Sequence, residues 1–132
     1  MHQQIAQISL LVRDYDEAID FYVNTLGFQL KEDTQLSPEK RWVVVGPNSG
    51  EGCNLLLEKA ANEEQSKYIG RQTGGRVFLF LNTDDFDRDY ENYTNKGVKF
   101  IRPPEVMEYG KVSVFEDLYG NLWDLIGRET GK

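Results

Sequence analysis

The sequence is poor in the residues that most often carry covalent catalysis. It has one cysteine, Cys53, and one histidine, His2, among 132 residues. A single cysteine cannot form an internal disulfide, which is the usual situation in a reducing cytosol. A single histidine so near the N-terminus argues against a catalytic triad or a Cys-His pair. The sequence therefore contains no recognisable nucleophilic site.

Long hydrophobic runs and an excess of positive charge are also missing. The longest apolar runs, such as residues 77–81, have about five residues, whereas a membrane-spanning helix needs about 20. The net charge of -7 repels nucleic acid and anionic membranes at long range. The first residues, MHQQIAQ, lack the basic and apolar regions of a signal peptide. We therefore expect a cytoplasmic protein that binds neither nucleic acid nor membrane.

The length and composition fit one globular domain over residues 1–132. The chain is 39% hydrophobic and 12% aromatic, which argues against wholesale disorder. A chain of this length can bury a core but cannot form two independent domains.

The first half reads as a strand, a helix and three more strands. Residues 5–12 have the period-2 alternation of a strand, and residues 13–28 have the apolar spacing of an amphipathic helix. Asp14 occupies the position where a capping residue accepts a hydrogen bond from a backbone N–H of the first helical turn. Gly27 can take the left-handed conformation that ends a helix. The three further strands are expected at 28–35, 41–46 and 53–59.

The second half repeats this order. Residues 76–81 predict a strand and 83–97 a helix, followed by strands at 98–102, 111–115 and 121–126. Aligning Ile8 with Val77 gives a period of about 70 residues. We expect a duplication of residues 5–59 and 76–128, joined by a linker at 60–75. The linker is either a spacer or a loop that covers a site.

The duplication and two segments resemble the vicinal oxygen chelate superfamily, which includes glyoxalase I, fosfomycin-resistance enzymes, extradiol dioxygenases and bleomycin-binding proteins. The two segments are VRDYDEAIDFYVNTLGF in the first half and FEDLYGNLWDLIG in the second. The resemblance implies an α+β fold of two βαβββ modules, whose mixed sheets curl into an open half-barrel. It also implies a homodimer with a small-molecule ligand inside the curl.

Enzymes of this family hold a divalent metal, such as Zn, Ni, Mn or Fe, on the first and last strands of each module. Gln7 and Asp124 match two of these positions and fit as oxygen donors. Arg76 matches a third position, but a guanidinium has no lone pair to give. The fourth position falls on Asn54, and Glu58 lies on the same face of that strand. A full standard metal site is therefore not expected, and the metal candidates are Gln7, Glu58 and Asp124.

Arg76 and Asp124 have three alternative interpretations. They form an ion pair, or Arg76 simply faces the surface, or Arg76 binds an anionic or carbonyl-bearing ligand. Strand alternation places Ser9, Phe78 and Phe80 in the same cavity, and for aromatic residues such as Trp42 core packing is the alternative. The predicted ligand-binding residues are Arg76, Asp124, Gln7, Ser9, Phe78, Phe80, Trp42, Glu108 and Tyr109.

Three functions stay open at this point. The protein is a metal-dependent glyoxalase, lyase or dioxygenase-type enzyme, a metal-free protein that sequesters a small aromatic or cationic compound, or a metal-free enzyme acting on a carbonyl compound. The acidic balance and the aromatic cavity favour the sequestering protein.

Overall fold

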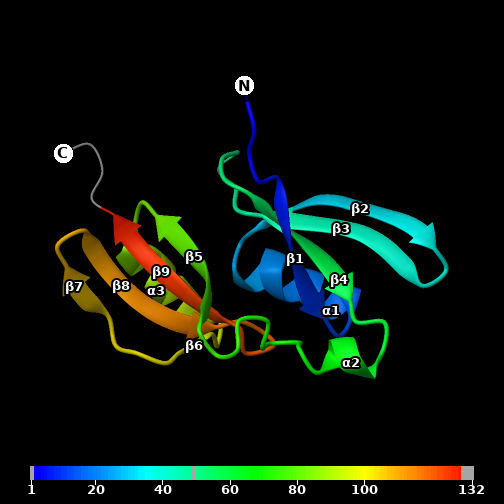
Figure 1. Cartoon of the computed structure of the whole chain (residues 1–132). Coiled ribbons are helices and arrows are strands. Elements are labelled where there is room, and N and C mark those ends of the chain that lie inside the picture. Colours follow the sequence, from blue (N-terminus) through cyan, green and yellow to red (C-terminus); the bar gives the residue numbers. More distant parts are fainter. Residues whose placement is uncertain (1, 49, 129–132) are drawn as a thin grey trace. The chain divides into compact units, whose positions relative to one another are not determined.

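The computed structural model describes residues 2–48 and 50–128. The chain divides into two compact units, residues 1–69 and 70–132. Each unit holds a mixed sheet with few helices, and neither sheet closes into a barrel, which confirms the predicted α+β class (Figure 1). Among the described residues, no helix is both long enough and apolar enough to cross a membrane.

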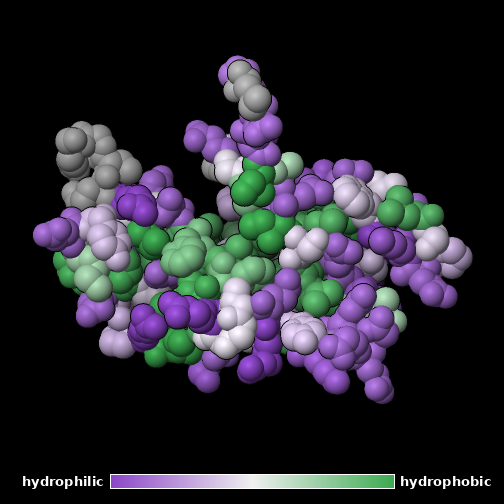
Figure 2. Space-filling model, viewed as in Figure 1, coloured by the Kyte–Doolittle hydropathy of each residue, from purple (hydrophilic) through white to green (hydrophobic). Residues whose placement is uncertain are grey.

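The first unit contains a four-stranded sheet in the order β1-β4-β3-β2, with β1 parallel to β4. One face of this sheet carries helix α1 (Figure 1). The elements are β1 (Gln7–Val12), α1 (Tyr15–Ile19), π-helix η1 (Asp20–Thr25), β2 (Gln29–Ser37), β3 (Lys40–Gly46), β4 (Asn54–Lys59) and α2 (Glu63–Ser66). Strand β2 is exposed along its whole length, and Figure 2 shows mostly hydrophilic residues over β2 and β3.

The residues predicted to begin and to end the first helix do so in the structure. The side chain of Asp14 accepts a hydrogen bond from the backbone N–H of Glu17 at 2.8 Å, which satisfies a donor at the helix start. Gly27 has a φ of 80°, the left-handed conformation that ends the helical segment. The segment changes from α to π geometry at Asp20, a difference that the hydrophobic spacing alone did not predict. On the sheet, Leu10 and its partner Leu57 are fully buried in the core.

The second unit has the strand order β5-β9-β8-β6, with β5 parallel to β9 and β7 paired to β8. Helix α3 lies on one face of this sheet. The elements are β5 (Val77–Thr83), α3 (Phe86–Asn95), β6 (Lys99–Phe100), β7 (Glu105–Met107), β8 (Gly110–Glu116) and β9 (Leu122–Arg128). Both units therefore pair their first strand in parallel with their last one, as in a βαβββ module.

One strand of the second unit differs from the prediction. The strand expected at 98–102 is confined to Lys99–Phe100, and a separate strand, β7, follows it at Glu105–Met107. Pro103 and Pro104 lie between them. Proline has no backbone N–H to donate to a sheet, so the pair of prolines interrupts this edge.

Strand β5 contains an irregularity that changes which side chains share a face. Val77 pairs with Leu122, but the next pair is Leu79 with Trp123, so Phe78 falls between the paired residues. A bulge of this kind shifts the alternation of side chains by one residue. Val77 therefore lies on the same face as Leu122 and Asp124, whereas Leu79 lies on the opposite face with Trp123.

A buried turn fixes the start of β9. The carboxylate of Asp117, which is 6% exposed, accepts from the backbone N–H groups of Tyr119 and Asn121 at 3.0 Å each. It also accepts from the indole N–H of Trp123 at 3.0 Å. The Trp123 ring stacks on Phe115 with centroids 5.7 Å apart. Asp117 thus joins the turn to the aromatic core and holds in place the strand that carries Asp124.

Candidate functional site

We call the sheet surface opposite the helix the helix-free face of each unit. In the first unit this face holds Gln7, which pairs with Asn54, and Ser9, whose hydroxyl donates to Glu58 Oε1 at 2.7 Å. The side chain of Asn54 covers Gly46, where an added Cβ would lie 2.1 Å from Asn54 Oδ1. The structure therefore places these predicted polar residues on one face, and it already gives Glu58 a hydrogen-bond partner.

Trp42 belongs to the same face of the first unit. It precedes Val43, which is fully buried on the helix side, so alternation directs Trp42 to the helix-free face. Its side chain is half-buried. Trp42 is thus available for contact on that face, and its register partner on β2 is Thr34.

In the second unit, Phe80 and Asp124 occupy paired positions on β5 and β9. Phe80 is 65% exposed. The carboxylate oxygen Oδ1 of Asp124 is buried, and no donor within the described ranges of the chain reaches it. Burial raises the pKa of Asp124, and the positive charge of Arg102 acts in the opposite direction. This pair combines an exposed ring with an acceptor that lacks a donor.

Arg102 follows β6, which lies on the other side of β8 from β9, the strand of Asp124. The backbone carbonyl of Arg102 accepts from the hydroxyl of Ser113 at 2.6 Å, and the N–H of Ile101 donates to Val114 at 2.8 Å. Val114 is in turn the partner of Asp124 on β9. The sequence did not predict a role for Arg102, because no motif distinguishes an arginine that follows a short strand.

Arg76 does not form the predicted ion pair with Asp124. It precedes β5 and is exposed, and its backbone carbonyl accepts from the hydroxyl of Thr73 at 2.6 Å. No ion pair joins it to Asp124 in the part of the chain that the structure describes. The prediction assumed an uninterrupted strand, whereas the bulge at Phe78 and the end of β5 at Val77 separate the two positions.

Glu108 and Tyr109 lie at the turn between β7 and β8 rather than beside Asp124. Tyr109 is about half exposed, and the guanidinium of Arg128 lies 5.8 Å from its ring centroid. Glu108 is exposed and lines a pocket at this hairpin. The structure thus separates these two predicted residues from the Phe80–Asp124 pair.

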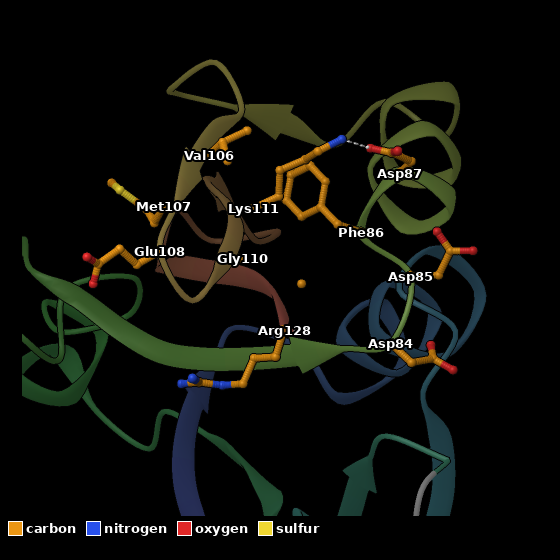
Figure 3. A pocket seen from close by; sticks show the side chains of 11 residues that line it. Asp84, Asp85, Phe86, Asp87, Val106, Met107, Glu108, Gly110, Lys111 and Arg128 are labelled. Carbon is orange, nitrogen blue, oxygen red and sulfur yellow. Dashed lines mark hydrogen bonds and ion pairs between the residues drawn. The ribbon is translucent and has the colours of Figure 1, made fainter. Parts of the chain in front are cut away.

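The hairpin pocket has a volume of about 440 Å³ and lies on the α3 side of the sheet. Lys111 and Gly127 are paired there, and the Lys111 ammonium forms an ion pair with Asp87 of α3 at 2.7 Å, beside the Phe86 ring (Figure 3). Asp84 pairs with Arg88, and Asp85 caps α3. Because these four charged groups already have partners within the protein, they offer a ligand less unmet bonding capacity than Asp124 Oδ1.

The metal candidates do not fit a standard metal centre within either unit. Across residues 2–48 and 50–128, no three His, Cys, Asp or Glu side chains are grouped as ligands of one ion. In the first unit Gln7 offers only a neutral amide oxygen, and Glu58 is bonded to Ser9. In the second unit Asp124 pairs with Phe80, whose side chain has no atom that can bind a metal. We therefore derive no reaction step through a metal.

Comparison with known proteins identifies the family. The model of the Glyoxalase/Bleomycin resistance protein/Dioxygenase superfamily matches residues 4–125. The chain belongs to this superfamily. A protein of Shewanella frigidimarina (strain NCIMB 400) is 61% identical over 127 residues, covering 96% of this chain and 94% of its own length. The resemblance to the vicinal oxygen chelate superfamily is thus confirmed.

Solved structures of the superfamily agree with the fold. A member from Sphaerobacter thermophilus DSM 20745 is 35% identical, covers 95% of this chain and 97% of its own, and has a TM-score of 0.78. TnmS3, described as an antibiotic binding protein from Streptomyces sp. CB03234, is 29% identical with a TM-score of 0.75, covering 97% of this chain and 98% of its own. A protein of similar fold is thus described as an antibiotic binding protein.

Proposed function

We propose that this member of the superfamily is a small-molecule-binding protein whose ligand lies on the helix-free face of the second unit. The observation that carries the proposal is Asp124 Oδ1, a buried acceptor without a donor in the described chain. A buried polar atom left unpaired costs about 1–3 kcal/mol. Because Oδ1 has almost no exposed surface, the carboxylate must turn toward the surface to meet a ligand, and a ligand that then donates to it removes that cost.

The exposed ring of Phe80 supplies the second half of the contact. It lies beside Asp124 and presents 65% of its surface. A planar ligand covers this ring while its polar edge meets the carboxylate, and stacking of aromatic rings adds about 0.5–1.5 kcal/mol. The antibiotic-binding relative TnmS3 supports a ligand of drug size.

The proposal also covers the other predicted residues, the oligomeric state of the protein and its location in the cell. Gln7, Ser9 and Trp42 offer polar and aromatic contacts on the corresponding face of the first unit. The exposed guanidinium of Arg76 is a candidate anchor for an anionic group. We propose a cytoplasmic homodimer that binds no nucleic acid, in line with the family resemblance and the net charge of -7.

The test is a thermal-shift screen with metal-free bleomycin and a set of planar aromatic antibiotics. A ligand that binds the native state raises the melting temperature. We expect Phe80→Ala to abolish the shift and Tyr68→Ala, which removes another exposed aromatic ring, to keep it. An unchanged shift in Phe80→Ala contradicts the proposal.

Elemental analysis after loading with Zn, Ni, Mn or Fe distinguishes the proposed binding protein from a metal-dependent enzyme. A binding protein of the proposed kind retains no stoichiometric metal after dialysis. Retention of about one ion per chain, lost in Asp124→Ala, would replace the proposal with a metal-dependent glyoxalase, lyase or dioxygenase-type enzyme.

A further inference from the structure

We infer that Arg128 binds a carboxylate group of the ligand, so that the helix-free face of the second unit selects an aromatic acid over a neutral aromatic compound. The inference rests on the proposed function, which places a planar body on Phe80. It adds a second binding position on that face and the charge that the ligand carries there.

The side chain of Arg128 lies on the same helix-free face as Asp124. The two residues are four positions apart on β9, so strand alternation directs both side chains to one face. Gly127, between them, faces α3, since a Cβ at this position would lie 2.5 Å from the Cβ of Phe86. In Figure 3 the Arg128 side chain accordingly extends away from Phe86.

Two neutral side chains hold the Arg128 guanidinium in place. Its Nε–H donates to Asn82 Oδ1 at 3.1 Å, and its central carbon lies 5.8 Å from the centroid of the Tyr109 ring. Among residues 2–48 and 50–128, no carboxylate forms an ion pair with Arg128. The guanidinium is therefore positioned while its charge is not neutralised.

The contact with Asn82 leaves the outer end of the guanidinium open. It uses Nε, and the two terminal nitrogens of Arg128 have no hydrogen-bond acceptor in the part of the chain that the structure describes. A pair of guanidinium N–H groups matches the two oxygens of a carboxylate, and charge-assisted bonds of this kind are stronger than those to a neutral group. A ligand carboxylate thus binds Arg128 without displacing Asn82.

The position of Asn82 sets the distance between the acid and the planar body. Asn82 follows Phe80 by two residues on the same face of β5, which is about 7 Å along the strand. Both side chains are exposed, and β5 is an edge strand, so one ligand can cover the ring and reach the guanidinium. Asp124 lies four residues from Arg128, about 13 Å along β9, so the acid does not meet this carboxylate.

The experiment compares 6-hydroxy-2-naphthoate with 6-hydroxy-2-naphthamide, which share one ring body and one hydroxyl and differ in charge. Each is titrated into the whole ¹⁵N-labelled protein at mildly acidic pH, where the arginine N–H exchanges slowly enough to be observed. We expect the acid to bind about three- to tenfold tighter than the amide and to shift the Nε–H signal of Arg128. In Arg128→Gln the two affinities should agree within about twofold.

The matched control is Lys111→Gln. It removes one positive charge from the same end of the sheet, but Lys111 lies on the α3 side and pairs with Asp87 at 2.7 Å. We expect this variant to keep the preference for the acid within about twofold of the wild type. An equal loss of preference in Lys111→Gln and Arg128→Gln shows a general effect of net charge and overturns the inference. A larger loss in Lys111→Gln assigns the acid to the hairpin pocket and overturns it as well.

Failure of the inference differs from failure of the proposed function. Equal binding of the acid and the amide, with saturable shifts at Phe80, overturns the role of Arg128 while the site still binds a planar body. A preference for the acid that persists in Arg128→Gln has the same meaning. Absence of saturable shifts at Phe80 with both compounds overturns the proposed function and the inference with it.

Discussion

Phe80 lies beside Asp124 because of the bulge at Phe78. Val77 pairs with Leu122, and an uninterrupted strand would then place Leu79 beside Asp124. The bulge advances the register by one residue and brings an aromatic ring, 65% exposed, to the carboxylate instead. The pairing therefore depends on an irregularity of β5 rather than on its regular alternation.

Replacing Phe80 by alanine should have little effect on stability. Because the ring is mostly exposed, Phe80→Ala should change the free energy of unfolding by about 0.5 kcal/mol or less. Phe115→Ala, which truncates a fully buried ring, should lower it by about 3–5 kcal/mol. Urea denaturation followed by circular dichroism measures both values. A loss in Phe80→Ala close to that of Phe115→Ala would show that Phe80 belongs to the core.

Neutralising Asp124 should stabilise the protein at neutral pH. The folded-state pKa of Asp124 is raised above the ordinary value of 3.8, so the folded protein binds this proton more tightly than the unfolded chain. Stability is therefore lost as pH rises above about 3.8. Asp124→Asn avoids this loss, and screening by solvent keeps the gain at pH 7 below about 1 kcal/mol.

The measurement is a series of urea titrations between pH 3 and pH 7. The difference between Asp124→Asn and the wild type should shrink toward zero at the acidic end. Glu105→Gln, an exposed carboxylate on β7, serves as the control and should change little throughout. A gain in Asp124→Asn that is independent of pH would contradict the role of burial.

The Asp117 turn should be essential for stability. Asp117→Ala leaves the N–H groups of Tyr119, Asn121 and Trp123 without their common acceptor. We expect a loss of about 3 kcal/mol in the free energy of unfolding, against about 0.5 kcal/mol for the neighbouring Glu116→Gln. Similar losses in the two variants, measured by thermal denaturation, would show that the network contributes nothing specific.

Gly127 should resist substitution because α3 approaches it closely. A Cβ at this position would lie 2.5 Å from the Cβ of Phe86, so Gly127→Ala should cost about 1–3 kcal/mol. Gly46→Ala meets the end of the Asn54 side chain, which can rotate away, and should cost less than about 1 kcal/mol. The two melting temperatures compare these costs directly, and the reverse order would contradict the close approach of α3.

The fold follows from local patterns that act within short segments. The cap at Asp14, the turn at Gly27 and the alternation of 5–12 require only neighbouring residues, and each is present in the structure. The bulge at Phe78 changes the face of a side chain without any change in composition. The Arg76–Asp124 ion pair, one of the alternatives that the sequence left open, is therefore not formed.

Other parts of the site depend on contacts that no sequence spacing encodes. Arg102 follows the short strand β6 and precedes two prolines, and β8 lies between this segment and the strand of Asp124. The hairpin pocket needs both the start of α3 and the β7–β8 turn. The division of the chain into repeats at 5–59 and 76–128, with a linker at 60–75, stays a prediction.

The most direct test of the central claim is a ¹H–¹⁵N correlation spectrum of the whole protein titrated with planar aromatic fragments. We predict saturable shifts that centre on Phe80 and Asp124 and that disappear in Phe80→Ala. Shifts that centre instead on Phe86, Lys111 and Gly127 in the hairpin pocket, and persist in Phe80→Ala, would contradict the account.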